Sequence, residues 1–255
     1  MLQRHLKIIE LLETNERLDV TTLANRFNIS PSTIRKDLEY LESQGLLKRQ
    51  HGYASRVSSD NITYRMAFNY EAKQAIAQAA SQLVCDGETI MIESGSTCAL
   101  FASLVAEKKK DLTIITNSTF IARYISTSNT SVILLGGDYH SDAEVLVGPF
   151  VKLCVSQIYV DKFFVGLSGF SPSRGFLNSN ISRAEAVQSM AESASKTYVL
   201  ADNTKFSQLS TIALFPSKLP AAVISNDPIP EDARIYFQEK GIQYIPAGKQ
   251  GAVSK

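Results

Sequence analysis

The sequence predicts a small, mainly α domain followed by a larger α/β domain whose sheet is mostly parallel. Up to Leu47 the apolar residues recur at helical spacing, whereas from Val84 onward short β-rich runs alternate with helical stretches. A polar, turn-forming segment at residues 57–61 separates these two patterns. We therefore expect a first domain at residues 1–56, a linker at 57–69 and a second domain at 70–255.

Composition and charge narrow the class of protein. The 255 residues are 44% hydrophobic and 20% charged with a net charge of +1, so any surface for nucleic acid must be local. The three cysteines are far apart, which argues against a disulfide framework. The chain has no run of about 18 apolar residues and no signal-peptide core, so we expect a cytoplasmic protein without a membrane segment. The three histidines lack metal-ligand spacing, and we expect neither a metal nor a cofactor.

Three apolar stripes predict three short helices in the first domain. The stripes are Leu2, Leu6, Ile9 and Leu12; Leu23, Ala24 and Phe27; and Ile34, Leu38 and Leu41. Asp19 is a suitable N-cap for the second helix. Ser30 suits the N-cap of the third helix and Pro31 its first position, and Gly45 should end it. Two helices joined by a short turn, the second of them capped, predict a helix-turn-helix.

The third helix and the segment after it carry the candidate DNA contacts. Since the apolar stripe faces the core, the polar residues at the start of this helix should be exposed, where a recognition helix meets the major groove. Residues 46–54 predict a β-hairpin wing whose basic residues could follow the DNA backbone. The candidates are Ser30, Ser32, Thr33, Arg35, Lys36, Lys48, Arg49 and His51. The alternative is a helical bundle with ordinary solvated charges, and a histidine such as His51 is by itself typical of a surface.

Seven β-rich runs predict the strands of the second domain. They are Thr89–Ile92, Leu112–Thr116, Ser131–Leu135, Lys162–Val165, Thr197–Leu200, Ala222–Ile224 and Ile242–Ile245. Several are apolar almost throughout, as strands covered on both faces are. Helical segments are expected between many of them, at Cys98–Glu107, Thr119–Ile125, Ser182–Ser195 and Glu231–Lys240.

Five loops that follow predicted strands carry small or polar residues. In an open parallel sheet such loops gather in one crevice, where ligands bind. Hydroxyl groups and the free N–H groups of a helix start can hold an anion there, and a lysine adds a charge for a phosphate. The candidate ligand-binding residues are Ser94, Gly95, Ser96, Thr97, Asn117, Gly136, Gly137, Gly166, Ser168 and Lys205. The alternative for each loop is an ordinary turn.

A resemblance to a known family rests on residues 30–54, which read SPSTIRKDLEYLESQGLLKRQHGYA. This run resembles the signature of the DeoR family of bacterial winged-helix transcription regulators. The matching positions are Ser30, residues 33–38, Leu41, Gly45 and His51-Gly52, whereas Tyr53 stands where the family usually has a second glycine. The resemblance implies that the chain binds operator DNA, usually as a repressor. It also implies that the α/β domain is an effector domain similar to ribose-5-phosphate isomerase.

The similarity to the isomerase concerns its binding residues rather than its catalytic ones. It places residues 95–97 on the isomerase's phosphate-proximal loop and Lys205 on a lysine of its substrate site. Isomerisation needs a carboxylate base, and the loop at residues 165–168, where the isomerase has aspartates, has no acidic residue. Glu185 lies near the position of an isomerase glutamate, although a lone carboxylate on a helix is typically a solvated charge. Many relatives have aspartate at the position of Glu93 and Asn or Asp at that of Ser168, so the effector's identity stays open.

These observations lead to one hypothesis and two alternatives. We predict a sequence-specific DNA-binding regulator, a repressor rather than an enzyme, that is controlled by a phosphorylated sugar or a related metabolite. Because helix-turn-helix proteins commonly read paired half-sites, we expect a homodimer or a higher homo-oligomer. The first alternative is a sugar-phosphate isomerase with an attached DNA-binding domain. The second is an architectural DNA-binding protein whose α/β domain is purely structural.

Overall fold

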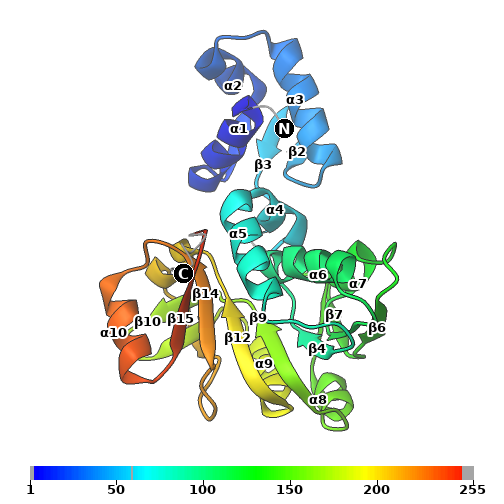
Figure 1. The fold of residues 1–255 in the computed structure, drawn as a ribbon. Coiled ribbons are helices and arrows are strands. Elements are labelled where there is room, and N and C mark those ends of the chain that lie inside the picture. Colours follow the sequence, from blue (N-terminus) through cyan, green and yellow to red (C-terminus); the bar gives the residue numbers. More distant parts are fainter. Residues whose placement is uncertain (1–2, 59, 249–255) are drawn as a thin grey trace, which may run out of the picture. The chain divides into compact units, whose positions relative to one another are not determined.

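The computed structural model describes residues 3–58 and 60–248, and the chain divides between Phe68 and Asn69 into two compact units (Figure 1). Leu2 of the first predicted stripe, Ser59 of the expected linker and residues 249–255 lie outside the described residues. The first unit extends past the boundary expected at residue 56, because helix α4 (Ile62–Ala67) places Tyr64 in its core. The segment 57–69 therefore contains a helix where the sequence predicts a linker.

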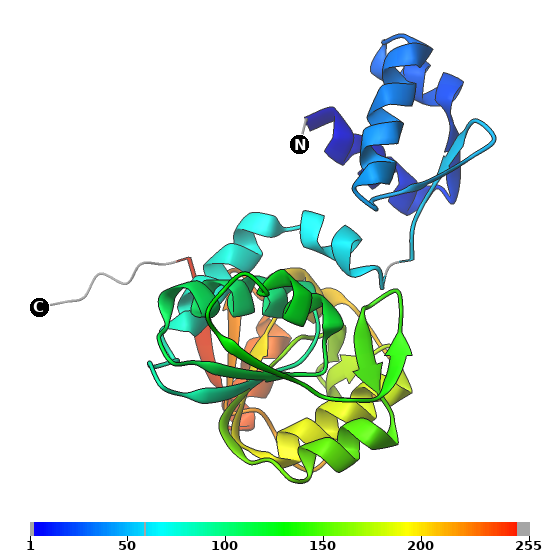
Figure 2. The same cartoon turned by 90° about the vertical axis from the view of Figure 1, so that its right-hand side faces the viewer.

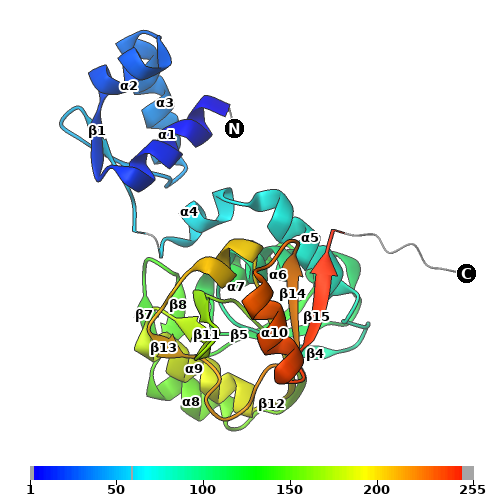
Figure 3. The ribbon, with the colours of Figure 1, turned by 90° about the vertical axis from the view of Figure 1, so that its left-hand side faces the viewer.

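The N-terminal unit packs its helices against a small antiparallel sheet (Figure 3). In chain order it begins with α1 (Gln3–Thr14), β1 (Arg17–Asp19), α2 (Val20–Phe27), α3 (Pro31–Ser43), β2 (Lys48–Gln50) and β3 (Tyr53–Ser55), and the strand order is β1-β3-β2. The core includes Ile9, Leu23, Ile34, Leu38 and Leu41, all from the predicted stripes. The three predicted helices and the hairpin are confirmed, and β1 adds a third strand that the sequence does not predict.

The predicted helix boundaries of this unit are confirmed by their hydrogen bonds. The Asp19 carboxylate accepts a hydrogen bond from the backbone N–H of Thr22 at 2.9 Å, as an N-cap does. At the end of α3, the N–H of Gly45 donates to the Glu42 carbonyl at 2.8 Å and the N–H of Leu46 to the Leu41 carbonyl at 2.9 Å. These two bonds satisfy carbonyls that the end of a helix would otherwise leave open.

A seven-stranded sheet, parallel throughout, forms the centre of the C-terminal unit. Its order is β15-β14-β12-β9-β4-β5-β6. The strands are β4 (Thr89–Ile92), β5 (Thr113–Thr116), β6 (Ser131–Leu134), β9 (Val160–Val165), β12 (Ala194–Leu200), β14 (Ala222–Asn226) and β15 (Gln243–Ala247). Each of the seven predicted runs corresponds to one of them, so the predicted α/β fold is confirmed.

Helices cover both faces of this sheet (Figure 2). One face is packed by α5 (Tyr70–Ser81), α6 (Ser96–Lys108) and α7 (Thr119–Tyr124), and the other by α8 (Pro149–Val155), α9 (Ile181–Glu192) and α10 (Glu231–Glu239). Strand β9 illustrates why both faces need helices. Its Phe164 contacts Phe101 of α6, with ring centroids 4.4 Å apart, while Phe163 belongs to the core cluster on the α9 side. Successive side chains of a strand point to opposite faces, so an apolar strand needs cover on both.

Several smaller elements complete the unit and are not predicted by the sequence. The strands β7 (Asp138–His140) and β8 (Val145–Val147) form a hairpin. A second antiparallel sheet has the order β10-β11-β13, with bounds Gly169–Ser171, Gly175–Asn178 and Ile212–Ala213. A short 3-10 helix, η1 (Asn203–Ser207), follows β12. In the described part of the chain, no helix is both long and apolar enough to cross a membrane.

Candidate functional site

The start of α3 presents a cluster of hydroxyl groups beside basic side chains. The Ser30 Oγ accepts from the backbone N–H of Thr33 at 3.2 Å and lies 2.8 Å from Ser32 Oγ and 2.9 Å from Thr33 Oγ1. Ser30 is therefore used as the helix cap, whereas the side chains of Ser32, Arg35 and Lys36 are exposed. Exposed donors and charges on the first turns of a capped helix are what a recognition helix offers to a groove.

Asp37 lies on the buried face of α3 and joins that helix to α1. Its carboxylate accepts hydrogen bonds from Nε of Arg4 at 2.6 Å and from Nη2 of Arg4 at 2.9 Å. It also lies 3.1 Å from Nε2 of His5. Burial raises the pKa of the Asp37 carboxyl, but the hydrogen bonds from Arg4 and His5 outweigh burial, so the pKa is lowered overall. Sequence reasoning missed this buried group, which ties α3 to α1.

The hairpin of β2 and β3 turns at His51 and Gly52. Their φ angles of 47° and 84° are those of a two-residue turn with both central residues in the left-handed region, which glycine accommodates at the second position. Lys48 and His51 are exposed. Arg49 is instead bound to Glu42 of α3. Its backbone N–H donates to Oε1 of Glu42 at 2.8 Å, and its guanidinium lies 3.8 Å from Oε2.

Tyr53, which departs from the family pattern, contacts a basic residue of strand β1. The Arg17 guanidinium carbon lies 5.2 Å from the centre of the Tyr53 ring, in the geometry of a cation–π contact. Both side chains are exposed and belong to neighbouring strands, β1 and β3. Arg17 therefore adds positive charge to the sheet that carries the wing. The sequence gives no sign of this, because β1 was not predicted.

In the C-terminal unit, the five predicted loops follow five adjacent strands. The strands β12, β9, β4, β5 and β6 are neighbours in that order and parallel, so their carboxyl ends share one edge of the sheet. Neighbouring strands lie about 4.8 Å apart, and the loops after β12 and β6 are therefore separated by roughly 19 Å. A small sugar phosphate can contact the central loops, but it cannot contact all ten candidate residues at once.

The central loop connects β4 to α6 and has a backbone that only glycine adopts readily. Gly95 has a φ of 124° and a ψ of 156° and serves as the N-cap of α6. The N–H of Ala99 donates to the Gly95 carbonyl at 2.8 Å, which starts the helix at this point. The side chains of Ser94, Ser96 and Thr97 are buried, at 1%, 4% and 7% exposure. The loop thus directs hydroxyl groups and a helix start into a closed polar region.

Next to this loop lies a buried ion pair that links two distant parts of the chain. Oε1 of Glu93 lies 4.0 Å from Nη2 of Arg183, and both side chains are at most 5% exposed. The Ser94 hydroxyl donates to the same Glu93 oxygen at 2.6 Å. A Cβ at Gly166, after β9, would lie 3.9 Å from Oε2 of Glu93, so the loops after β4 and β9 meet here. This cluster is the best-defined polar site of the unit.

Arg183 was not among the predicted residues, although its position carries a signal. It lies in the first turn of α9, whose N-cap is Asn180. A cation at a helix N-terminus is unfavourable towards the helix dipole, so a buried one indicates an acidic side chain or an anionic ligand nearby. Glu185, two residues further on, is exposed and lies on the opposite face of the helix. It is therefore badly placed to act as the base that the isomerase alternative needs.

The loops after β5 and β6 pack against the β7–β8 hairpin. Nδ2 of Asn117 donates to the Leu146 carbonyl at 2.9 Å, and Oδ1 of Asn117 is buried without a hydrogen-bond partner among the described residues. A Cβ at Gly137 would lie 2.5 Å from the Val147 carbonyl oxygen, so this glycine allows close backbone packing. Gly136 is exposed. Gly137 therefore allows the hairpin to pack closely against the sheet.

The loop after β12 carries Lys205 in η1 and is tied to the first residue of the unit. Nζ of Lys205 donates to Oε1 of Gln208 at 3.0 Å, and the side chain is half-buried. Asp202, which is 2% exposed, caps η1 and accepts a hydrogen bond from Nδ2 of Asn69 at 3.2 Å. Ser168, after β9, is half-buried and its N–H donates to the Leu177 carbonyl at 3.2 Å.

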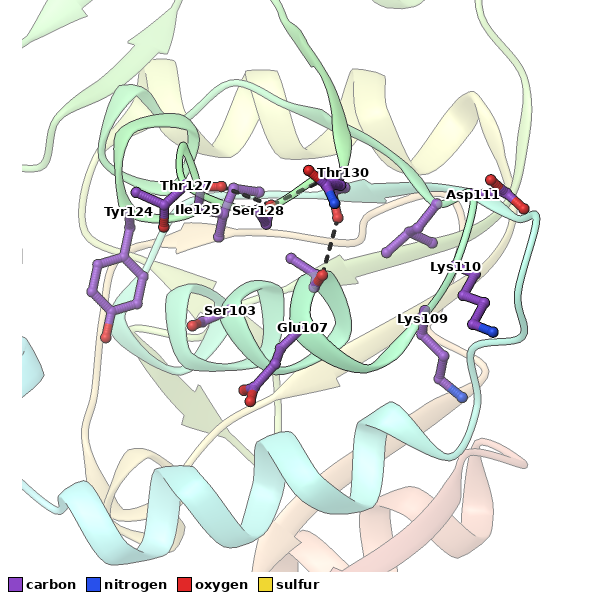
Figure 4. A pocket seen from close by; sticks show the side chains of 13 residues that line it. Ser103, Glu107, Lys109, Lys110, Asp111, Tyr124, Ile125, Thr127, Ser128 and Thr130 are labelled. Atoms are coloured by element: carbon purple, nitrogen blue, oxygen red, sulfur yellow. Dashed lines mark hydrogen bonds between the residues drawn. The ribbon is translucent and has the colours of Figure 1, made fainter.

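A cavity of about 680 Å3 lies at the opposite end of the strands from this polar cluster (Figure 4). It is lined by the end of α6, the segment that leads into β5 and the segment between α7 and β6. Figure 4 shows both acidic and basic side chains around it, including Glu107, Lys109, Lys110 and Asp111. The cavity lies at the amino ends of β5 and β6 and is separate from the polar cluster at the carboxyl ends.

Two family models match the chain. Residues 4–60 match the DeoR-like helix-turn-helix domain, and residues 68–227 match the DeoR C-terminal sensor domain. The chain is 31% identical to the HTH-type transcriptional regulator GolR of Listeria innocua, over 94% of this chain and 96% of that protein. It is 30% identical to the transcriptional repressor AccR of Agrobacterium fabrum, over 81% and 82%. It is 29% identical to the L-fucose operon activator of Haemophilus influenzae, over 93% and 97%.

Solved structures were matched as well. Ribose 5-phosphate isomerase A of Methanocaldococcus jannaschii aligns with 54% of this chain and 55% of its own, with 20% identity and a TM-score of 0.41. A likeness of this extent says nothing about an activity. The matches to the two family models and to full-length regulators together cover both units of the chain.

Proposed function

The chain belongs to the DeoR family of transcriptional regulators, and on that premise we propose that it is a repressor whose affinity for operator DNA is set by a phosphorylated sugar. Like these relatives, it is a transcriptional regulator and not an enzyme. The relatives include a repressor and an activator by name, and the repressor role is our proposal. Because its partner is chromosomal DNA, we place its work in the cytoplasm.

DNA binding would use the exposed face at the start of α3 and the wing. We propose that Ser32, Arg35 and Lys36 contact base edges or phosphates in the major groove, while Lys48 and His51 follow the backbone. Ser30 and Thr33 support the contact through the helix cap. Arg49 can contribute only if it leaves Glu42. Reading paired half-sites would require a homodimer or a higher homo-oligomer.

Effector binding would use the polar cluster around Glu93. The observation that carries this proposal is a buried arginine, Arg183, beside the glycine-capped start of α6. A guanidinium group and helix N–H groups recognise a phosphate, and Ser94, Ser96 and Thr97 supply hydroxyl groups around it. Lys205 would reach the other end of the ligand from η1. The effector's phosphate would compete with the Glu93 carboxylate, which lies 4.0 Å from Arg183.

A thermal-shift panel tests the effector, comparing sugar phosphates with the same sugars without phosphate. One phosphate should raise the melting temperature saturably and its parent sugar should not, because only a ligand that binds the folded state stabilises it. Arg183→Gln should remove the shift, and Arg174→Ala, which changes an exposed arginine, should keep it. Equal shifts with both members of a pair, or none with any phosphate, would contradict a phosphate sensor.

A separate titration tests repression. Purified protein should bind DNA from upstream of its own or neighbouring genes, with an affinity that falls steeply with salt. The effector found in the thermal-shift panel should change this affinity. Binding without any effect of the effector would leave a DNA-binding protein without a sensor. A reporter gene behind the bound DNA should be silenced by the chain, and activation of the reporter would overturn the repressor proposal.

A further inference from the structure

The two edges of the seven-stranded sheet differ in how they are protected. The strand β15 at one edge contains Pro246, which has no N–H to offer, and its large apolar side chains are half-buried. The strand β6 at the other edge reads Ser-Val-Ile-Leu, with no charge and no proline. Its Ile133 and Leu134 are 46% and 44% exposed. Edge strands are normally protected by charge, proline or a covering element. Strand β6 contains neither a charge nor a proline.

The backbone of β6 directs hydrogen-bonding groups outward at this edge, where no further strand lies among the described residues. The N–H groups of Ser131 and Leu135 donate towards β5, to the carbonyls of Leu112 and Thr116 at 3.2 and 2.8 Å. Because successive residues of a strand point their polar groups to alternate sides, Val132 and Leu134 direct their N–H and C=O groups away from β5. The two exposed apolar side chains lie on opposite faces, since Ile133 is in register with Ile115 and Leu134 with Thr116.

This combination determines what can cover the edge. A helix or a loop laid on one face would leave the other exposed side chain and the outward N–H groups in water. Only another strand satisfies the backbone groups and brings side chains to both faces at once. A second copy of this chain supplies such a strand with the same unprotected sequence, and a two-fold interface uses the same surface on both partners.

We propose that the chain dimerises by antiparallel pairing of β6 with β6 of a second copy, about a two-fold axis at Ile133. In this register Val132 faces Leu134 of the second copy, and Leu134 faces its Val132. These two pairs exchange four backbone hydrogen bonds, because they involve the residues whose polar groups point outward. The two Ile133 residues then face each other as a non-hydrogen-bonded pair, and the two seven-stranded sheets become continuous.

Single cysteines test this register. In a Cys85→Ser and Cys154→Ser background, Ile133→Cys should form a disulfide-linked dimer under mild oxidation. In a non-hydrogen-bonded antiparallel pair the Cα atoms lie about 4.5 Å apart, within the range of about 4.4 to 6.8 Å for a disulfide. Leu134→Cys is the matched control, because two such residues would lie roughly 8 to 9 Å apart by strand geometry and cannot be bridged without backbone movement. Equal cross-linking of both variants, or of neither, would overturn the proposed register.

Sedimentation of the full chain tests the interface independently. Placing Ile133→Lys and Leu134→Lys together should convert the dimer into a species of half the mass, since charge on an edge strand prevents pairing. The control is Phe150→Lys with Leu153→Lys, which removes two apolar side chains of α8 that are even more exposed, at 62% and 61%. A monomeric wild type, an unchanged mass for the edge variant, or dissociation by the α8 variant instead would each contradict the proposal. DNA affinity is measured separately, so failure here leaves the regulatory function standing.

Discussion

The two candidate sites are both polar, but one is open and the other is closed. At the start of α3, Ser32, Arg35 and Lys36 are exposed and the helix is already capped and fixed by Asp37. At the carboxyl ends of β4 and β9, Glu93 and Ser94 are at most 2% exposed and already bond to each other. Under our proposal a DNA duplex would meet the start of α3 without rearrangement, whereas an effector would have to replace the bonds between Glu93, Ser94 and Arg183. A site that changes its own contacts on binding is suited to sensing.

The largest expected effect comes from the group that holds the open site in place. Asp37→Ala should lower the free energy of unfolding of the N-terminal unit by about 3 kcal/mol, because it leaves Arg4 and His5 without their buried partner. Glu39→Ala, two residues further along α3 and exposed, is the control and should change stability little. Urea unfolding followed by circular dichroism measures both. Similar midpoints for the two variants would show that Asp37 does not fix the helix.

The same carboxyl group predicts how stability depends on pH. Its pKa is lower in the folded state, so its contribution is present above its unfolded pKa of about 3.9 and is lost as the pH falls through the folded value. Between pH 7 and pH 3 the wild type should therefore lose more stability than Asp37→Asn, which has no carboxyl group to protonate. Urea midpoints at the two pH values decide this, and parallel losses in both proteins would reject the assignment.

The closed site depends on a backbone conformation as well as on its buried charges. Gly95→Ala should destabilise the C-terminal unit by about 2 kcal/mol, because φ at this position is 124° and a Cβ is strained there. Gly136→Ala is the matched control, since a Cβ at that glycine meets no atom within 4 Å and its φ lies outside the strained range. Denaturant midpoints should separate the two variants clearly. A tolerated alanine at residue 95 would mean that the β4–α6 loop can relax.

A smaller effect is expected at the cap of the recognition helix. Ser30→Ala should lower the free energy of unfolding by about 1 kcal/mol. It removes the acceptor for the N–H of Thr33 and the bond between the hydroxyls of Ser30 and Thr33. Ser43→Ala at the other end of α3 removes two exposed hydrogen bonds, one to the Tyr40 carbonyl and one from Nε2 of Gln44 at 3.5 Å, and should lower stability less. The thermal midpoint of each variant, compared with that of the wild type, ranks the two ends of the helix.

The smallest effect concerns the wing. Lys48→Ala should weaken binding to all DNA sequences alike and reduce the slope of log affinity against log salt by about one, as loss of one phosphate contact does. Lys7→Ala, which removes an exposed charge from α1, should leave the slope unchanged. Fluorescence anisotropy at several salt concentrations gives both slopes. A change confined to one DNA sequence would instead make Lys48 a base contact.

The elements that could be predicted from the sequence are those whose pattern is local. The seven core strands and the helix-turn-helix follow from local patterns, since an apolar run or a capped stripe is visible within ten residues. The strands β7, β8, β10, β11 and β13 are short and lie against other elements, so their sequences carry no period of their own.

The candidate residues follow the same division. The exposed residues of α3 were predictable because they are what remains when the apolar stripe is buried. The pair of Glu93 and Arg183 was not, because it joins residues 90 positions apart that only the strand order brings together. The close approach of Gly137 to the Val147 carbonyl was likewise not predictable, because it depends on a hairpin that the sequence does not predict.

The hydrogen bond between Asn69 and Asp202 has a mechanical consequence. Asn69 is the first residue of the C-terminal unit, and Asp202 caps the short helix that carries Lys205. The Asp202 carboxylate thus links the start of η1 to the residue at which the C-terminal unit begins. Any change in the position of η1 would alter a hydrogen bond next to the peptide bond that joins the two units.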